Sequence, residues 1–148
     1  MTYKEKAMNY FKQGYNCAQS VLLAFGDHTG LEEETAARMA SAFGGGMGRM
    51  REVCGAVSGA LMAAGLISGY SDPAARTEKT ELYARVQRIA AGFRTENGSI
   101  ICRELLGSEM GQNTNPTPDT RTPEYYRKRP CVELVGIAAE ITAEELGL

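Results

Sequence analysis

Residues 53 to 67 read VCGAVSGALMAAGLI, and almost every side chain in this run is apolar or small. Ser58 is its main polar residue. A helix that is apolar on every side is usually the buried centre of a bundle. The run is shorter than the ~20 residues that a membrane-spanning helix needs. It therefore predicts a central helix buried among other helices.

The rest of the chain also has helical periodicity, interrupted by glycine and proline, and contains no alternating run that would indicate a strand. Asp72-Pro73 has the form of an N-cap followed by proline at the first helical position. Four of the five prolines lie within residues 107–130, which favours a long irregular loop there. We therefore expect residues 1–148 to form a single all-α domain, a bundle of about six helices with one Pro-rich loop.

Four cysteines, each at a predicted helix start, are candidates for a functional site: Cys17, Cys54, Cys102 and Cys131. Apolar residues follow each of them at offsets of three, four or seven, so each thiol shares the inward face of its helix. A helix N-terminus carries a partial positive charge and free N–H groups, which stabilise a thiolate. A free cysteine is also a common small core residue. Four in equivalent positions nevertheless favour thiols that converge on one redox or metal site.

Composition and cysteine spacing exclude some kinds of partner and some kinds of metal site. The net charge of −2 gives no electrostatic footprint for nucleic acid or an anionic membrane, and we expect neither as a partner. The first residues lack the apolar core of a secretion signal, which favours a cytoplasmic protein, where metal binding or redox chemistry outweighs a structural disulfide. Successive cysteines are 37, 48 and 29 residues apart, so no closely spaced pair of the zinc-ribbon kind exists.

A glycine-rich stretch precedes Cys54 and reads Phe43-Gly44-Gly45-Gly46-Met47-Gly48-Arg49. It lacks the Lys-Ser/Thr ending of a P-loop and no strand precedes it, which disfavours nucleotide binding. We expect this backbone to pass close to a packed helix or a bound cofactor. The N–H groups of Gly44, Gly45, Gly46 and Gly48 would then hydrogen-bond to cysteine sulfurs, with Arg49 supplying positive charge.

These motifs together resemble the redox-active family named for its pattern C_GCAxxG_C_C. The resemblance runs from about Gly14 to Ala139 and includes the glycine-rich stretch and all four cysteines. It implies redox activity but no particular substrate. One departure concerns Cys54-Gly55-Ala56, where the family name has Gly-Cys-Ala. The cysteine is shifted by one residue, which on a helix rotates the thiol by ~100°.

Three hypotheses for the function follow. In the first, the four cysteines bind an iron–sulfur cluster or another thiophilic metal and transfer electrons with an unknown redox partner protein. In the second, they carry out metal-free thiol–disulfide chemistry. In the third, the cysteines are inert and buried, and the chain is an interaction module that forms a homodimer through its glycine-lined central helix. The sequence does not decide whether the protein is an enzyme, and we assign no catalytic residue.

Overall fold

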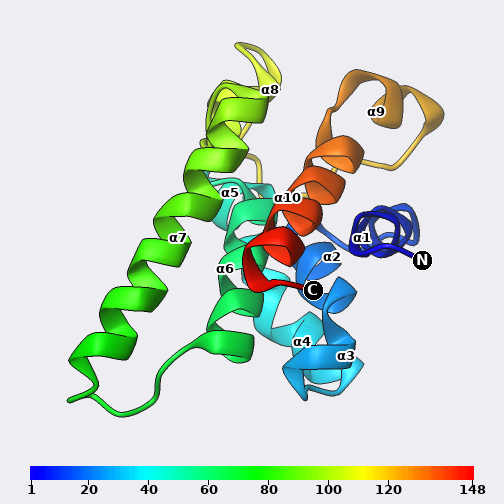
Figure 1. Ribbon diagram of the computed structural model, residues 1–148. Helices are drawn as coiled ribbons and strands as arrows, with labels where there is room; N and C mark the ends of the chain where they lie inside the picture. Colours follow the sequence, from blue (N-terminus) through cyan, green and yellow to red (C-terminus); the bar gives the residue numbers. More distant parts are fainter.

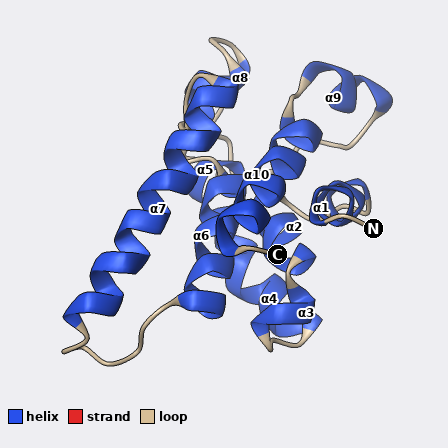
Figure 2. Ribbon diagram, viewed as in Figure 1, coloured by secondary structure: helices blue, strands red, loops and turns tan.

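The computed structural model describes all residues from 1 to 148 as helices joined by loops, without a β-strand (Figures 1 and 2). The prediction of an all-α fold is confirmed. The helices are α1 (Tyr3–Lys12), α2 (Cys17–Ala24), α3 (Gly26–Thr29), α4 (Glu33–Ala40), α5 (Gly44–Met47), α6 (Gly55–Ser68), α7 (Arg76–Asn97), α8 (Cys102–Leu106), α9 (Pro123–Lys128) and α10 (Cys131–Leu146). Two 3₁₀ turns span Ser41–Phe43 and Met110–Gln112.

Six of these helices have eight or more residues, in agreement with the expected bundle of about six: α1, α2, α4, α6, α7 and α10. The predicted helix start at Asp72-Pro73 is wrong. The Asp72 carboxylate accepts a hydrogen bond from the N–H of Ala74, and this local turn delays the start of α7 until Arg76.

The Pro-rich loop is less irregular than expected, because α9 lies inside it. The side chain of Thr122 accepts a hydrogen bond from the N–H of Tyr125, and Pro123 occupies the first helical position. Both features favour a helix start. The prediction of a continuous irregular segment over residues 107–130 is therefore wrong at its C-terminal end.

Helix α6 lies at the centre of the molecule and packs against α2, α7 and α10 (Figure 1). Its buried residues are small, which lets neighbouring backbones approach closely. A Cβ atom added to Gly59 would lie only 2.4 Å from the carbonyl oxygen of Ala18 in α2. This part of the glycine-lined face is thus occupied within the chain, and dimerisation through α6 stays a prediction. The far end of α6 is more open, with Leu66 exposed.

Two features of the bundle place the ends of several helices in the same part of the molecule. Helices α1, α2 and α10 pack against one another, and Phe11, Val21 and Val135 are buried among the residues of their shared core. Helix α7 runs along one side and ends at Asn97. Its C-cap Gly98 has a left-handed backbone, after which the chain returns to pair with Val53 through Ile101 (Figure 1). None of the helices combines the length and the hydrophobicity needed to cross a bilayer.

Candidate functional site

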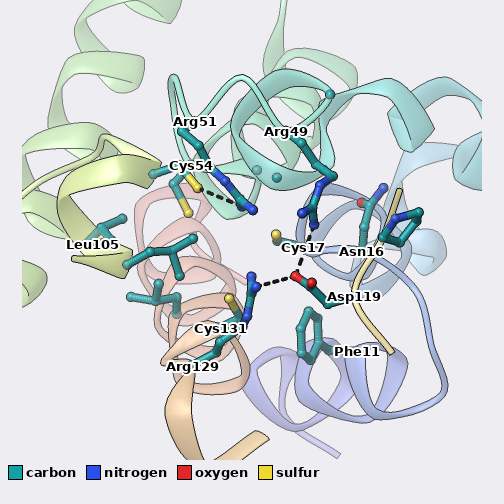
Figure 3. Close-up of a pocket in the computed structure, with 18 of the residues that line it drawn as sticks. Phe11, Asn16, Cys17, Arg49, Arg51, Cys54, Leu105, Asp119, Arg129 and Cys131 are labelled. Carbon is teal, nitrogen blue, oxygen red and sulfur yellow. Dashed lines mark hydrogen bonds and ion pairs between the residues drawn. The ribbon is translucent and has the colours of Figure 1, made fainter. Parts of the chain in front are cut away.

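All four cysteines line one cavity of about 280 Å³. Cys17, Cys102 and Cys131 are the first residues of α2, α8 and α10, and Cys54 is the N-cap of α6. The predicted helix starts are therefore confirmed. Figure 3 shows the sulfur atoms of Cys17, Cys54 and Cys131 facing the same space. The structure thus brings together thiols from four separate segments of the chain.

Cys17 is held at the cavity by a well-defined helix start. The side chain of Asn16 accepts from the N–H of Gln19, and the Gln19 side chain accepts from the N–H of Asn16, which completes a capping box. The backbone N–H groups of Gly45 and of Cys17 itself favour the Cys17 thiolate and so lower its pKa. A Cβ atom on Gly55 would lie 3.2 Å from that sulfur, so glycine leaves room for it.

Cys17 and Cys131 titrate as a pair. A hydrogen bond from the Cys131 thiol, helped by the two N–H groups and by the charge of Arg121, lowers the pKa of Cys17 to about 6 although burial opposes this. The same hydrogen bond, together with burial, raises the pKa of Cys131 well above its ordinary value. The interaction therefore favours the thiolate form of Cys17 and the protonated form of Cys131. Both residues are partly accessible to solvent.

Cys54 and Cys102 are buried, and burial is the main cause that raises the pKa of each thiol. A short antiparallel contact holds their segments together. Val53 pairs with Ile101, the N–H of Cys54 donates to the carbonyl of Ile100 at 2.8 Å, and the N–H of Cys102 donates to the carbonyl of Glu52 at 2.6 Å. This bridge places both cysteines on the same wall of the cavity, as neutral thiols.

The glycine-rich stretch forms another wall and has an unusual backbone. Of the residues proposed from the sequence for this stretch, Gly44, Gly45, Gly48 and Arg49 line the cavity, whereas Gly46 does not. A Cβ atom on Gly46 would approach the Cβ of Cys102 to 2.6 Å. Left-handed φ angles occur at Gly45, Gly46 and Gly48, and also at three residues with side chains: Met47, Arg49 and Arg51. Such conformations are strained for non-glycine residues and cluster at functional sites.

Four arginines and one carboxylate are the charged side chains of the cavity: Arg49, Arg51, Arg121, Arg129 and Asp119. Asp119 pairs with both Arg49 and Arg129, the former at 3.3 Å (Figure 3). Only Arg49 was predicted as a site residue. Nothing in the sequence distinguished Asp119 or Arg121 from ordinary loop residues.

Residues 113–121 pass over the cavity and are fastened there by arginine side chains. Arg49 and Arg51 donate through Nε to the carbonyls of Asn115 and Asn113. Arg121 donates to the carbonyls of Phe11 and Tyr15, and its guanidinium lies 4.1 Å from the centre of the Phe11 ring. We name residues 113–121 the strap.

The side chains of the cavity do not form a site for a single metal ion. No group of three or more histidine, cysteine, aspartate or glutamate side chains converges closely enough to hold a single metal ion. The single histidine, His28, lies away from the cavity beside Asp27.

A family model described as "Putative redox-active protein (C_GCAxxG_C_C)" matches residues 15–145, a range that includes all four cysteines and the strap. The chain belongs to the C_GCAxxG_C_C family. An "Uncharacterized protein" of Archaeoglobus fulgidus is 29% identical over 150 residues, which cover 97% of this chain and 92% of that protein. No solved structure matches the chain.

Membership in the C_GCAxxG_C_C family supports the coarse functional expectation of a redox-active protein with a cysteine-rich site. The shifted Cys54 does not separate this chain from the pattern. As the N-cap of α6, Cys54 lies outside the regular helix, and its side chain lines the same cavity as the other three cysteines. The feature that the C_GCAxxG_C_C pattern does not mention is the set of arginines around the thiols.

Proposed function

We propose that Cys17 and Cys131 form a reversible thiol–disulfide pair that exchanges two electrons with a substrate bound in the cavity. The observation that carries this proposal is that the two thiols at the starts of α2 and α10 line the same cavity, are both partly accessible and shift each other's pKa in opposite directions. A reversible disulfide needs an accessible attacking thiol and a resolving thiol within reach.

The two cysteines have different roles in this proposal. Cys17 attacks, because the N–H groups of Gly45 and Cys17 and the hydrogen bond from Cys131 stabilise its thiolate. Cys131 resolves, because its thiol keeps its proton until Cys17 has reacted and no longer accepts its hydrogen bond. Cys54 and Cys102 are deeper and neutral, so they are poor nucleophiles in this arrangement.

The exchange balances as follows. The Cys17 thiolate attacks one sulfur of a disulfide substrate, forms a mixed disulfide and releases one substrate thiolate. Cys131 then loses its proton and attacks the Cys17 sulfur, which releases the second substrate thiol and closes the Cys17–Cys131 disulfide. Two electrons have passed to the substrate. A redox partner protein, still to be identified, would restore the dithiol by the reverse exchange.

Thiol counting in single-cysteine variants tests this proposal. Metal-free protein should lose two thiols on mild oxidation and regain both with a reductant. Cys54→Ala and Cys102→Ala should still lose two, whereas Cys17→Ala and Cys131→Ala should lose none as monomers. Loss of two thiols in Cys17→Ala would contradict the pair.

An iron–sulfur cluster held by all four cysteines is the second candidate, and the residues and charge of the cavity lining support it. Four thiols and no other metal-binding side chain except Asp119 line the space. The arginines would compensate the negative charge of a cluster with four thiolate ligands, and a neutral disulfide would not use that charge. Cys17, Cys54, Cys102 and Cys131 would hold the cluster, which would supply one-electron transfer.

The two candidates differ in what the protein contains. Iron with acid-labile sulfide in protein purified without oxygen, lost in each of the four Cys→Ser variants, would establish the cluster. Metal-free protein that stays metal-free after attempted reconstitution would leave the thiol pair. The Cys54→Ala variant separates them most sharply, because it should abolish a four-cysteine cluster and leave the Cys17–Cys131 exchange intact.

A further inference from the structure

Two guanidinium nitrogens in the cavity wall have no hydrogen-bond partner although both are buried: Nη2 of Arg49 and Nη2 of Arg51. Arg51 is 2% exposed and is among the largest fully buried side chains of the protein. Buried charges are normally paired with an opposite charge and hydrogen-bonded at every donor. The missing partners of these two donors therefore call for an explanation.

The contacts of Arg51 do not supply a counter-charge. Its Nε donates to the carbonyl of Asn113 at 2.9 Å, and its Nη1 lies 3.8 Å from the sulfur of Cys102. A carbonyl and a neutral thiol are weak partners for a guanidinium, which binds carboxylates and oxyanions through paired N–H groups. No carboxylate lies against Arg51.

The positive charge of Arg49 is only partly neutralised. Its Nη1 pairs with Asp119, but Asp119 also pairs with Arg129, so one carboxylate serves two guanidinium groups. Arg121 has carbonyl partners alone. With four arginines and one aspartate, the lining carries a formal charge of +3 when the cysteines are neutral and +2 when Cys17 is a thiolate. A cavity with such an excess concentrates small anions.

The backbone holds these two arginines together in a demanding geometry. Both have left-handed φ angles, 67° for Arg49 and 62° for Arg51. A Cβ atom on Gly45 would lie 2.7 Å from Cγ of Arg49 and 3.7 Å from Nη1 of Arg51, so the absence of a side chain there lets both enter from the same wall (Figure 3). The chain thus tolerates strain at two positions in order to direct two guanidinium groups inward.

We propose that Arg49 and Arg51 form a binding subsite for the anionic oxygens of a small molecule, a carboxylate or a tetrahedral oxyanion, inside the cysteine cavity. The volume of about 280 Å³ compares with the ~30 Å³ that a water molecule occupies in the liquid, so a small organic anion fits. This inference deepens the proposed function and rests on it in one respect: the bound anion would belong to the substrate of the Cys17–Cys131 pair, placed beside Cys17.

Binding is tested first, without reference to thiol chemistry, with inorganic sulfate as the probe. Replacing chloride by sulfate at equal ionic strength should raise the unfolding temperature of the wild type and of Cys17→Ser by about 4 °C at tenfold excess over Kd. Arg49→Gln and Arg51→Lys should lose this increment. Arg103→Gln is the matched control, because Arg103 follows Cys102 but pairs outside the cavity with Glu52.

Substrate placement is tested next, by alkylating Cys17 with two reagents of nearly equal size, anionic iodoacetate and neutral iodoacetamide. The rate with iodoacetate divided by the rate with iodoacetamide should fall about tenfold in Arg49→Gln. The reason is that a charge-assisted contact between Arg49 and the carboxylate of iodoacetate is lost. This ratio of rates should not change in Arg103→Gln. The neutral reagent corrects for any change in the reactivity or accessibility of Cys17 itself.

The outcomes separate the sources of the anion. Sulfate stabilisation with an unchanged alkylation ratio would assign the subsite to a free inorganic oxyanion. A changed ratio without sulfate stabilisation would assign it to the carboxylate of an organic substrate. Equal sulfate responses and equal ratios in wild type, Arg49→Gln and Arg51→Lys would overturn the subsite. If Cys17 reacts with neither reagent, the thiol pair fails, and the sulfate measurement in Cys17→Ser still decides the anion site.

Discussion

Cys17 and Cys131 begin α2 and α10, two helices that pack against each other, and both cysteines line the same cavity. The interaction of the two thiols moves their pKa values in opposite directions, down for Cys17 and up for Cys131. One thiolate beside one thiol is the state from which a disulfide exchange starts. The other two cysteines, which have raised pKa values, lie deeper in the same cavity.

The first prediction concerns the pH dependence of Cys17. Its alkylation by iodoacetamide should increase with pH through a midpoint of about 6, because the thiolate reacts and the thiol does not. Cys131→Ala should move the midpoint upward toward the ordinary thiol value, because the hydrogen bond from Cys131 is the largest cause of the lowered pKa. Mass spectrometry of the modified peptide gives the rates. Midpoints near the ordinary value in both proteins would contradict the pair.

The second prediction concerns the close approach of α2 and α6. Gly59→Ala should lower the free energy of unfolding by about 1–3 kcal/mol, because its Cβ atom would meet the Ala18 carbonyl at 2.4 Å. Gly65→Ala, in the same helix, should raise it by up to ~1 kcal/mol, because no atom lies within 4 Å and alanine is the better helix former. Urea unfolding measures both free energies. Equal effects of the two substitutions would show that the close packing of α2 against α6 does not require glycine at position 59.

The third prediction concerns the strap. Asp119→Asn removes the carboxylate that pairs with Arg49 and Arg129, so the strap should open more often. We expect Cys54 and Cys102 to be alkylated about tenfold faster, with unchanged helix content by circular dichroism. Glu124→Gln is the control, because it breaks only the exposed pair with Lys128. Unchanged alkylation of the buried thiols in Asp119→Asn would mean that the strap does not limit access.

The helix starts at the cysteines could be predicted from the sequence, because they depend on local signals. Asn16 and Gln19 form a cap around Cys17, and apolar residues follow each cysteine at helical spacing. Proline gave a less reliable signal. Thr122-Pro123 begins a helix, whereas Asp72-Pro73 begins a turn that ends before α7. The two dipeptides look alike, and the contacts that decide between them lie outside the dipeptide.

Apart from Arg49, the charged part of the site could not be predicted, because it depends on contacts between distant segments. Arg51 meets Asn113, and Arg121 reaches the carbonyls of Phe11 and Tyr15, through hydrogen bonds that follow no periodicity. Asp119 lies in a Pro-rich segment whose path is set by those bonds. The bridge between Val53 and Ile101 is similarly too short to leave a strand signal.

The most direct test of the central claim is a disulfide map of the metal-free protein after mild oxidation. Proteolysis without reductant, followed by mass spectrometry, identifies which cysteines are joined. We predict one intramolecular link, between the peptides that contain Cys17 and Cys131, which disappears on reduction, while Cys54 and Cys102 remain thiols. A link between Cys54 and Cys102, or four unpaired thiols under conditions that oxidise an ordinary dithiol, would contradict the account.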